Sequence, residues 1–342
     1  RMSGTKLVMG ASGFLGSHVT RQLVGRGDRV RVWVRESSSK VAFDDLDVEH
    51  HYGDLADADA LRTAMKDVDA VFYCIVDARA WLRDPAPLYA TNVEALRNVL
   101  DAAVEVGVPR FVFCSTVGTI AVAESGLADE TTPHNWRRLG GAYVDSRIKA
   151  EELVLQYHRE QGLPAVVLNV GTTFGPRDHG PTPHGKLARA AARGKMPAYA
   201  KGASMEVVGI EDAASAFLLA EEHGRPGERY IISERCLPTK GIFDIAADEG
   251  GATPPRIGIP RPAMRVIGAV GGMVSRAMGR DSVVTPTSVR LLYVQTALDH
   301  SKATRELGWQ PAPIEDAIRA GVRWFLSQDG RDLNSAAPQA PA

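Results

Sequence analysis

Short apolar stretches alternate with longer amphipathic stretches through the first half of the chain. The short stretches are rich in Val and Phe, which is typical of strands: KLVMG, RVRVWV, VEHHYG, AVFYCIV, RFVFCST and AVVLNV. The sequence between them predicts helices over residues 14–25, 57–66, 88–106 and 143–161. Strands and helices in alternation predict a parallel sheet that is covered by helices on both faces.

This alternation ends near residue 171, where the Gly- and Pro-rich segment TFGPRDHGPTPHG follows. MEVVG, IEDAASAFLLAEEH and ERYIIS then predict a strand, a helix and a strand, and PIEDAIRAGVRWFL predicts an amphipathic helix. We expect an α/β, doubly wound Rossmann domain from residues 1–170, to which segments at about 206–235 and 296–300 return. Residues 171–205 and 236–330 are expected to form a smaller substrate-binding part, and 331–342 a disordered tail.

Composition narrows the classes of partner and compartment. The 342 residues are 44% hydrophobic and carry a formal net charge of -1, so no basic surface for nucleic acid is expected. Cys74, Cys114 and Cys236 lie far apart, which indicates neither a disulfide framework nor a zinc site. TKLVMG is too short an apolar run for a secretory signal, so we expect a cytoplasmic protein.

One apolar segment, residues 262–279, could be mistaken for a membrane span. Arg265 and Arg276 interrupt it, and it is too short and too charged to cross a bilayer. We interpret it as a packed lid helix, with a contact to another subunit or to a membrane surface as the alternative.

A glycine loop, MGASGFLGSH, lies between the first predicted strand and the first predicted helix. Glycines there permit a tight turn and a close approach of the backbone to a pyrophosphate, and the helix N-terminus supplies free N–H groups. The strand before the loop and the helix after it predict a dinucleotide site rather than an ordinary turn. The residues expected to bind the cofactor here are Gly10, Ser12, Gly13, Phe14, Leu15 and Gly16.

The end of the second strand bears on the choice of cofactor. An acidic residue there binds the ribose of NAD, but this strand ends at Arg35, with Lys40 a few residues on. These cations suit a 2′-phosphate and favour NADP(H), although Arg35 could also be an ordinary solvated residue beside Glu36. After the third strand, Asp54 could accept a hydrogen bond from the adenine amine, with Leu55 beside it at the cofactor. Alternatively, Asp54 could begin the next helix.

The segment AYVDSRIKAEE combines an aromatic hydroxyl with two cations. On an α-helix, Arg147 lies about 40° around the axis from Tyr143, whereas Lys149 lies about 120° away. Lys149 is flanked by Asp145 and Glu152 at ion-pair spacings, so we expect it to be a surface lysine. Arg147 is therefore the expected partner of Tyr143.

A nearby cation stabilises the phenolate form of a tyrosine and makes it a better general acid or base. Ser115 and Thr116 end the predicted strand RFVFCST, at the edge of the sheet where open α/β proteins bind ligands. A hydroxyl at this edge could hold a carbonyl oxygen while Tyr143 gives or takes the proton.

At these motifs the chain resembles the extended short-chain dehydrogenase/reductase superfamily. Its pattern Tyr-x-x-Ser-Lys-x-x-Ala-Glu is similar to the segment from Tyr143 to Glu151, with Arg147 in the place of the lysine. FVFCSTVGTIA, YATNVEALRNVL and NVGTTFGPRD resemble other segments of the family, and the likeness runs from residue 6 to about 325. GKMPAY and ATRELGWQPAPIEDAI look most like dihydroflavonol-reductase-like, 3β-hydroxysteroid-dehydrogenase-like and hopanoid-associated sugar epimerase-like members.

The resemblance implies roles for individual residues. Thr116, Tyr143 and Arg147 are the implied catalytic residues, and Asn92 is expected beneath the active site. The other residues implied to contact the cofactor, besides Tyr143 and Arg147, are Cys74, Ile75, Val170 and Thr173. Family likeness also implies a homodimer formed through the helices that begin near Leu88 and Tyr143.

Arginine in place of lysine leaves three outcomes open. The family lysine both lowers the pKa of the tyrosine and binds the nicotinamide ribose, and arginine is bulkier and planar. Arg147 could perform both tasks with shifted geometry, could perform them poorly, or could have lost them and left a non-catalytic NADP-binding sensor.

The loops expected to roof the site carry aromatic side chains. We expect Trp81, Trp136 and Phe174, together with Thr116, to contact a hydrophobic ketone, aldehyde or secondary alcohol. The alternative is a nucleotide-sugar epimerase or dehydratase with tightly bound NAD. Its diphosphate would be held by Arg177, Lys186, Arg189 and Arg193. No metal site is expected, because His50, His51, His179 and His184 have no ligand partners at suitable spacing.

Overall fold

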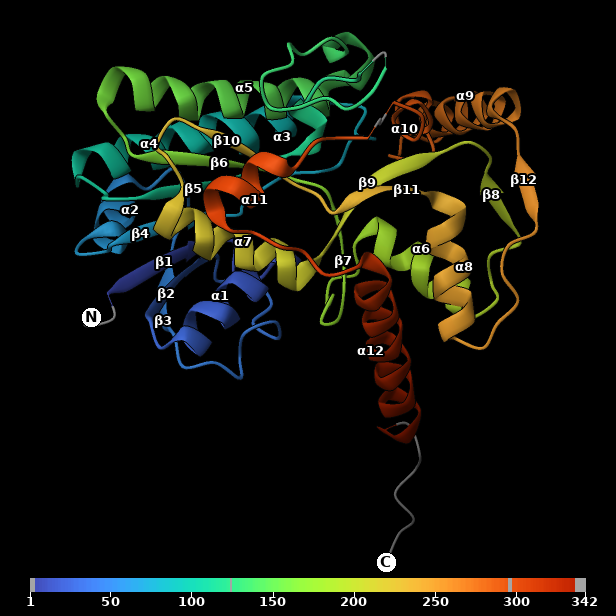
Figure 1. Ribbon diagram of the computed structural model, residues 1–342, viewed down its shortest axis with the longest axis horizontal. Coiled ribbons are helices and arrows are strands. Elements are labelled where there is room, and N and C mark those ends of the chain that lie inside the picture. Colours follow the sequence, from blue (N-terminus) through green and yellow to red (C-terminus); the bar gives the residue numbers. More distant parts are fainter. Residues whose placement is uncertain (1–3, 124, 295–296, 336–342) are drawn as a thin grey trace, which may run out of the picture.

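In the computed structural model, which describes residues 4–123, 125–294 and 297–335, seven parallel strands form the central sheet (Figure 1). Their order is β10-β6-β5-β4-β1-β2-β3. The strands are β1 (Thr5–Met9), β2 (Arg29–Val34), β3 (Glu49–Tyr52), β4 (Ala70–Tyr73), β5 (Phe111–Thr116), β6 (Ala165–Val170) and β10 (Arg229–Ile232). The predicted Rossmann sheet is thus confirmed. The strand order reverses between β1 and β4, which is where such sheets bind ligands.

Helices cover both faces of this sheet, as the alternation predicts (Figure 1). One face packs in a single apolar core with α1 (Phe14–Arg26), α7 (Ile210–His223) and α11 (Ser301–Leu307). The other face packs with α2 (Ala58–Met65), α4 (Ala95–Glu105) and α5 (Arg137–Gln161). Because both faces are covered, β1, β4 and β6 are buried at every position, whereas the edge strand β3 is polar and mostly exposed.

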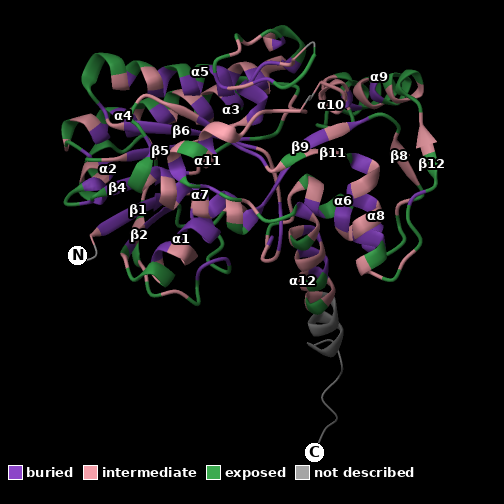
Figure 2. Ribbon diagram, viewed as in Figure 1, coloured by how far each residue is buried: buried purple, intermediate pink, exposed green. Residues whose placement is uncertain are grey.

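The smaller part is built around two short sheets and a third apolar core (Figure 2). One sheet has the order β11-β9-β7, and β12 pairs with β8 in the other. These strands are β7 (Thr172–Phe174), β8 (Ala198–Ala200), β9 (Ser204–Gly209), β11 (Arg235–Pro238) and β12 (Ile257–Ile259). The helices of this part are α6 (Pro183–Ala192), α8 (Thr239–Glu249), α9 (Arg261–Met278), α10 (Pro286–Leu291) and α12 (Ile314–Ser335).

Two expected segment assignments need correction. The segment 206–235 is expected to return to the Rossmann domain, but its strand β9 pairs with β7 and β11, and only its strand β10 joins the large sheet. Helix α12 continues to Ser335, so the tail expected from 331 begins as helix. Residues 336–342 lie outside the described part of the chain. The helix therefore extends beyond the amphipathic segment PIEDAIRAGVRWFL that predicts it.

Two predicted helices are interrupted beside the site. The helix expected over 88–106 consists of α3 (Ala86–Tyr89), a π-helical turn at Ala90–Glu94 and then α4. In α5, Gly141 has φ 68° and ψ −167°, so regular helix begins after it, just before Tyr143. Both interruptions set the direction of side chains that face the carboxyl edge of the sheet. A short 3₁₀ turn, Val117–Thr119, follows β5 at the same edge.

Candidate active site

The glycine loop joins β1 to α1 at the point where the strand order reverses. Gly10 has φ +94°, which strongly favours glycine, and a Cβ on Gly16 would lie 2.2 Å from the Gly10 carbonyl oxygen. Gly13 precedes α1 and provides no side-chain cap, and the first turn of the helix has no acidic residue. The N–H groups of this turn therefore remain open to an anion, and the cradle fits a dinucleotide pyrophosphate. Ser12 and Gly13 are exposed, and Phe14 and Leu15 are half-buried.

The two cations proposed to select NADP lie beyond the end of β2. Arg35 is exposed and makes no ion pair with Glu36 or any other described residue. Lys40 is also exposed, with its ammonium 4.8 Å from the centre of the Tyr52 ring. Both charges are therefore available to a phosphate group at the carboxyl edge of the sheet.

Asp54 does not begin the next helix. Asp57 is the N-cap of α2 and accepts a hydrogen bond from the backbone N–H of Ala60 at 3.0 Å. Asp54 is exposed and accepts from the N–H of Ala56, and the carbonyl of the neighbouring Leu55 accepts from Asn98. One of the two interpretations left open for Asp54 is thereby removed, and a contact to adenine stays a prediction.

The remaining residues expected around the cofactor lie on neighbouring strand ends. Cys74 and Ile75 follow β4 and lie against the glycine loop, because a Cβ on Gly10 would be 3.0 Å from the Cys74 carbonyl carbon. Val170 ends β6, and Thr173 lies in β7. Cys74 is packed tightly enough that burial raises the pKa of its thiol well above the ordinary value. The thiol therefore stays protonated at neutral pH, and Cys74 remains half-buried beside the glycine loop.

Asn92 has a structural position under the site. It is buried in the π-helical turn, and its amide nitrogen donates to the Asp77 carbonyl and to the Ser146 hydroxyl. Its amide oxygen accepts from the backbone N–H of Asp77 at 2.9 Å. Asn92 thus ties the loop after β4 to α5, and these contacts occupy its amide group.

Thr116, Tyr143 and Arg147 come together although they lie on two elements. Thr116 ends β5 and is half-buried, and α5 presents Tyr143 and Arg147 on one face. Thr116 lies within hydrogen-bonding reach of Tyr143, and the charge of Arg147 acts on the same phenol. Burial raises the pKa of Tyr143 above its ordinary value, while Arg147 and Thr116 oppose that rise.

Arg147 is only 1% exposed. Its Nη2 donates to the carbonyl of Cys114, and its guanidinium carbon lies 5.4 Å from the centre of the Phe113 ring. Its Nε and Nη1 are buried and have no hydrogen-bond partner among the described residues. Buried donors without partners are costly, so these two N–H groups fit an oxygen supplied by a bound molecule.

Lys149 lies where its spacing predicts. Its ammonium pairs with Asp145 at 3.0 Å and lies 4.8 Å from the centre of the Tyr89 ring, and about half of its side chain is exposed. It is a surface lysine on another face of α5 from Tyr143.

Tertiary contacts separate the two adjacent hydroxyls, Ser115 and Thr116. Ser115 is buried and donates to Glu151, which also accepts from Thr119 and Asn169 at 2.8 Å each. The other oxygen of Glu151 pairs with Arg229 at 2.6 Å. The Ser115 hydroxyl is therefore already hydrogen-bonded to Glu151, and Thr116 is the hydroxyl that remains beside Tyr143.

Asp77 is a residue of the site that the sequence analysis did not identify. It follows β4, is 8% exposed and pairs with Arg79, whose guanidinium holds the pKa of the carboxyl below its ordinary value. Its negative charge acts on Tyr143 and raises the pKa of that phenol. In the sequence, Asp77 could have been found from its position just beyond the carboxyl end of a strand that neighbours the glycine loop.

The residues expected to contact substrate are dispersed. Trp136 is 6% exposed, donates from its indole nitrogen to the Ile120 carbonyl at 2.8 Å, and packs against α5. Phe174 is 5% exposed in the core of the smaller part. Trp81 lies half-buried in the loop after β4. Trp136 and Phe174 are therefore mainly packing residues here, because neighbouring side chains cover their rings.

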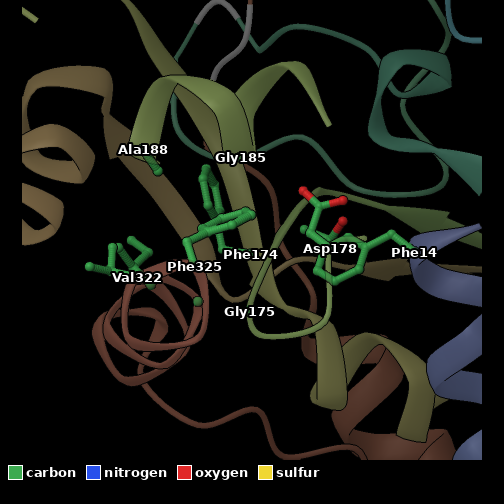
Figure 3. Close-up of a pocket in the computed structure, with 11 residues that line it drawn as sticks. Phe14, Phe174, Gly175, Asp178, Gly185, Ala188, Val322 and Phe325 are labelled. Atoms are coloured by element: carbon green, nitrogen blue, oxygen red, sulfur yellow. The ribbon is translucent and has the colours of Figure 1, made fainter. Parts of the chain in front are cut away.

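Two cavities lie around these loops. The first, between α1, β7, α6 and α12, includes Phe14, Thr173 and Phe174, and has a volume of about 10 Å³, room for about one water molecule (Figure 3). The second, of about 510 Å³, lies between the loop after β4 and the end of α9. Its size suits a small-molecule substrate. It is lined by Arg79, Leu82, Arg83, Asp84, Pro87, Gly279 and Asp281.

Other site types find no support in the described residues. They contain no cluster of three or more His, Cys, Asp or Glu side chains that could hold a metal ion. Among the helices that the structure describes, none combines the length and hydropathy needed to cross a bilayer.

The fold and motifs define a nucleotide-binding oxidoreductase or epimerase, and comparison with known proteins identifies the family. The chain belongs to the NAD dependent epimerase/dehydratase family, whose profile matches residues 6–233. This confirms the resemblance to the extended short-chain dehydrogenases/reductases and supports an enzyme that uses a nicotinamide dinucleotide.

Individual relatives span nearly the whole chain. A putative dihydroflavonol 4-reductase of Synechocystis is 31% identical over 95% of both chains. The sterol demethylase protein B of Methylococcus capsulatus is 30% identical over 94% of this chain and 98% of its own. The crystal structure of gox2253 is 35% identical, has a TM-score of 0.85 and covers 96% of this chain and 99% of its own.

Proposed function

We propose that this protein is an NADP-dependent oxidoreductase that interconverts a hydrophobic ketone or aldehyde and its alcohol. The observation that supports this most directly is the meeting of Thr116, Tyr143 and Arg147 at the carboxyl edge of the sheet, beside the glycine loop. Two hydroxyls and one fixed cation at that edge are what a carbonyl reduction requires.

The cofactor would be held by residues that fit each of its parts. The first turn of α1 would bind the pyrophosphate, Arg35 and Lys40 the 2′-phosphate, and the unpartnered N–H groups of Arg147 a ribose hydroxyl. When bound, the nicotinamide supplies or accepts the hydride.

The chain's own groups would move the proton. Because the pKa of Tyr143 is raised, its phenol is protonated at neutral pH and can donate to a carbonyl oxygen. The Thr116 hydroxyl would hold that oxygen. Arg147 would stabilise the phenolate that remains, and Asp77 would oppose this stabilisation. Oxidation of an alcohol runs through the same groups in reverse.

Two further observations support the choice of cofactor and substrate. Arg35 has no partner among the described residues, so its charge is not already neutralised by Glu36. The names of two relatives refer to a dihydroflavonol and to a sterol, which are hydrophobic carbonyl or hydroxyl compounds. The nearby 510 Å³ cavity is lined mostly by charged side chains and not by the aromatic ones expected around the substrate. The proposed substrate class therefore rests on the relatives and not on this lining.

The test of the proposed chemistry uses Tyr143→Phe. We expect this variant to bind NADPH with wild-type affinity and to lose about 100-fold or more in turnover, because only the proton donor is removed. The measurements are NADPH binding by fluorescence and NADPH consumption with a panel of hydrophobic ketones and aldehydes. Wild-type turnover in Tyr143→Phe would refute the assigned role.

The same assays test the cofactor with Arg35→Ala. We expect about a tenfold or greater loss of affinity for NADPH and little change for NADH, because the lost guanidinium pairs with the 2′-phosphate alone. Equal losses for both cofactors would contradict the preference for NADP. Product formation without net NADPH consumption would instead support the epimerase, and NADPH binding without turnover of any substrate would support the sensor.

A further inference from the structure

Helix α9 exposes a continuous apolar face. It forms the outer edge of the smaller part, beside α10 and after β12 (Figure 1). Six of its large apolar side chains are between 41% and 64% exposed, which is unusual on one helix of a soluble chain. They are Val266, Ile267, Val270, Met273, Val274 and Met278.

The opposite face of α9 packs against α10 and the segment before it. This packing keeps the exposed apolar side chains pointing away from the protein. A Cβ on Gly271 would lie 2.3 Å from the Val284 carbonyl oxygen, and one on Gly268 would lie 2.9 Å from the Val289 side chain. Ser275 is buried on the same face. Since small residues pack α9 against α10 and the segment before it, the helix cannot turn its large side chains inward without losing this contact.

The segment around the helix is strongly cationic. Residues 250–290 contain six arginines and one acidic residue, in a chain whose formal net charge is -1. Arg265, Arg276 and Arg280 are exposed and form no ion pair with any described residue. At 100° per residue, Arg265 and Arg276 lie beside each other along one border of the apolar face.

We propose that the exposed face of α9 binds the surface of an anionic lipid bilayer. An amphipathic helix with a large apolar face and arginines at its border lies in the interface, with its apolar side chains among the acyl chains. The arginines then meet lipid phosphates. A second copy of the chain fits less well, because it would bring the same arginines to the contact and only Asp281 to pair with them.

The hairpin of α9 and α10 touches the loop after β4 and the first turn of α5, the helix that carries the candidate catalytic tyrosine. The backbone N–H of Arg83 donates to Asp281 at 3.0 Å, and Arg290 donates to the Leu139 carbonyl at 3.2 Å. A bilayer on α9 would therefore lie next to the 510 Å³ cavity between α9 and the loop after β4. Entry of a lipid-soluble substrate from that side rests on the proposed function; binding of α9 to the bilayer does not.

Flotation with vesicles tests the proposal on the full chain without cofactor or substrate. The vesicles are phosphatidylcholine alone and phosphatidylcholine with added phosphatidylglycerol. We expect the wild type to float only with the anionic vesicles, and Arg265→Gln/Arg276→Gln to bind them about 30-fold more weakly. Val270→Ser/Met273→Ser should reduce binding by about tenfold or more, because the inserted apolar area is lost.

Matched substitutions elsewhere separate this surface from a general effect. Arg29→Gln/Arg159→Gln removes two exposed charges far from α9 in sequence, and Leu187→Ser removes an exposed leucine from α6. Both should float as the wild type does. The proposal is overturned if the wild type fails to bind anionic vesicles, or if the control variants weaken binding as much as the α9 variants. A dimer that Val270→Ser/Met273→Ser converts to monomer without vesicles would show that a second copy covers this face.

Discussion

At the scale of single residues, the arginine in the place of the family lysine is held in a defined position. Its Nη2 donates to the Cys114 carbonyl, and its guanidinium faces the Phe113 ring. A lysine has no planar face to stack on the Phe113 ring, and its single ammonium would have to serve both the carbonyl and a ribose hydroxyl. Of the three outcomes left open by the sequence, these contacts favour a site adapted to arginine.

Removing the charge tests how Arg147 acts on Tyr143. We expect Arg147→Met to raise the pKa of Tyr143 further, because burial and Asp77 then act without an opposing cation. The pH dependence of alcohol oxidation, which needs the phenolate, should move to higher pH, with kcat/KM about 100-fold lower at pH 7. The measurement is the pH profile of kcat/KM.

Companion variants make this prediction specific. Arg147→Lys keeps the charge, so its profile should stay near the wild-type position while kcat/KM falls about tenfold. Lys149→Met should leave profile and rate unchanged, because Lys149 pairs with Asp145 on another face. A shift in Lys149→Met as large as that in Arg147→Met would mean that the wrong cation has been assigned.

At the scale of elements, the two helices at the site are shaped by interruptions. Gly141 breaks α5 just before Tyr143, and the π-helical turn places Asn92 under the loop after β4. Apolar periodicity predicts that helices exist over these residues. It cannot predict the extra residue of the π-helical turn or a glycine with positive φ, because neither changes the pattern of apolar positions enough. Gly141 lies against Thr287 of α10, and Asn92 bonds the Asp77 backbone, and local periodicity encodes neither contact.

Gly141→Ala tests the interruption in α5. We expect it to lower the free energy of unfolding by about 1–3 kcal/mol and to reduce turnover, because φ 68° is strained for alanine and its Cβ would meet Thr287 at 3.0 Å. Gly25→Ala is the matched control, since nothing lies within 4 Å of its Cβ position on α1. It should be neutral or stabilising by up to about 1 kcal/mol. Urea unfolding and steady-state kinetics give both quantities, and equal effects at the two glycines would contradict this account.

At the scale of the whole molecule, buried polar groups join the large domain to the smaller part. His18 on α1 is 3% exposed and hydrogen-bonds through Nε2 to the carbonyl of Pro176, in the loop that follows β7. Burial lowers the pKa of His18 from 6.5 to about 4, and Arg21 and Arg177 act in the same direction. Glu206 on β9 accepts hydrogen bonds from Ser233 and from the N–H of Leu298, and burial raises the pKa of its carboxyl to about 7.

The lowered pKa of His18 predicts a loss of stability in acid. The unfolded chain takes up a proton near pH 6.5 and the native state only near pH 4, so this stabilisation is complete above pH 6.5 and is lost as the pH falls through that window. His18→Gln can donate to the same carbonyl and does not titrate. Between pH 7 and 4.5 we expect the wild type to lose about 2–3 kcal/mol more than this variant in urea unfolding. Parallel pH dependences in the two proteins would exclude His18 as the source.

The sequence alone determined the alternation of strands and helices, the glycine loop and the shared face of Tyr143 and Arg147. Each of these is a regularity among residues close together in the chain, where the periods of strand and helix apply. Only the tertiary structure decided that Ser115 donates to Glu151, so that Thr116 is the hydroxyl left beside Tyr143. It also decided that Asp77 lies near the same phenol and that α9 turns its apolar side chains outward. These depend on which distant groups meet when the sheet and its helices pack, because burial and pairing are set by neighbours in space.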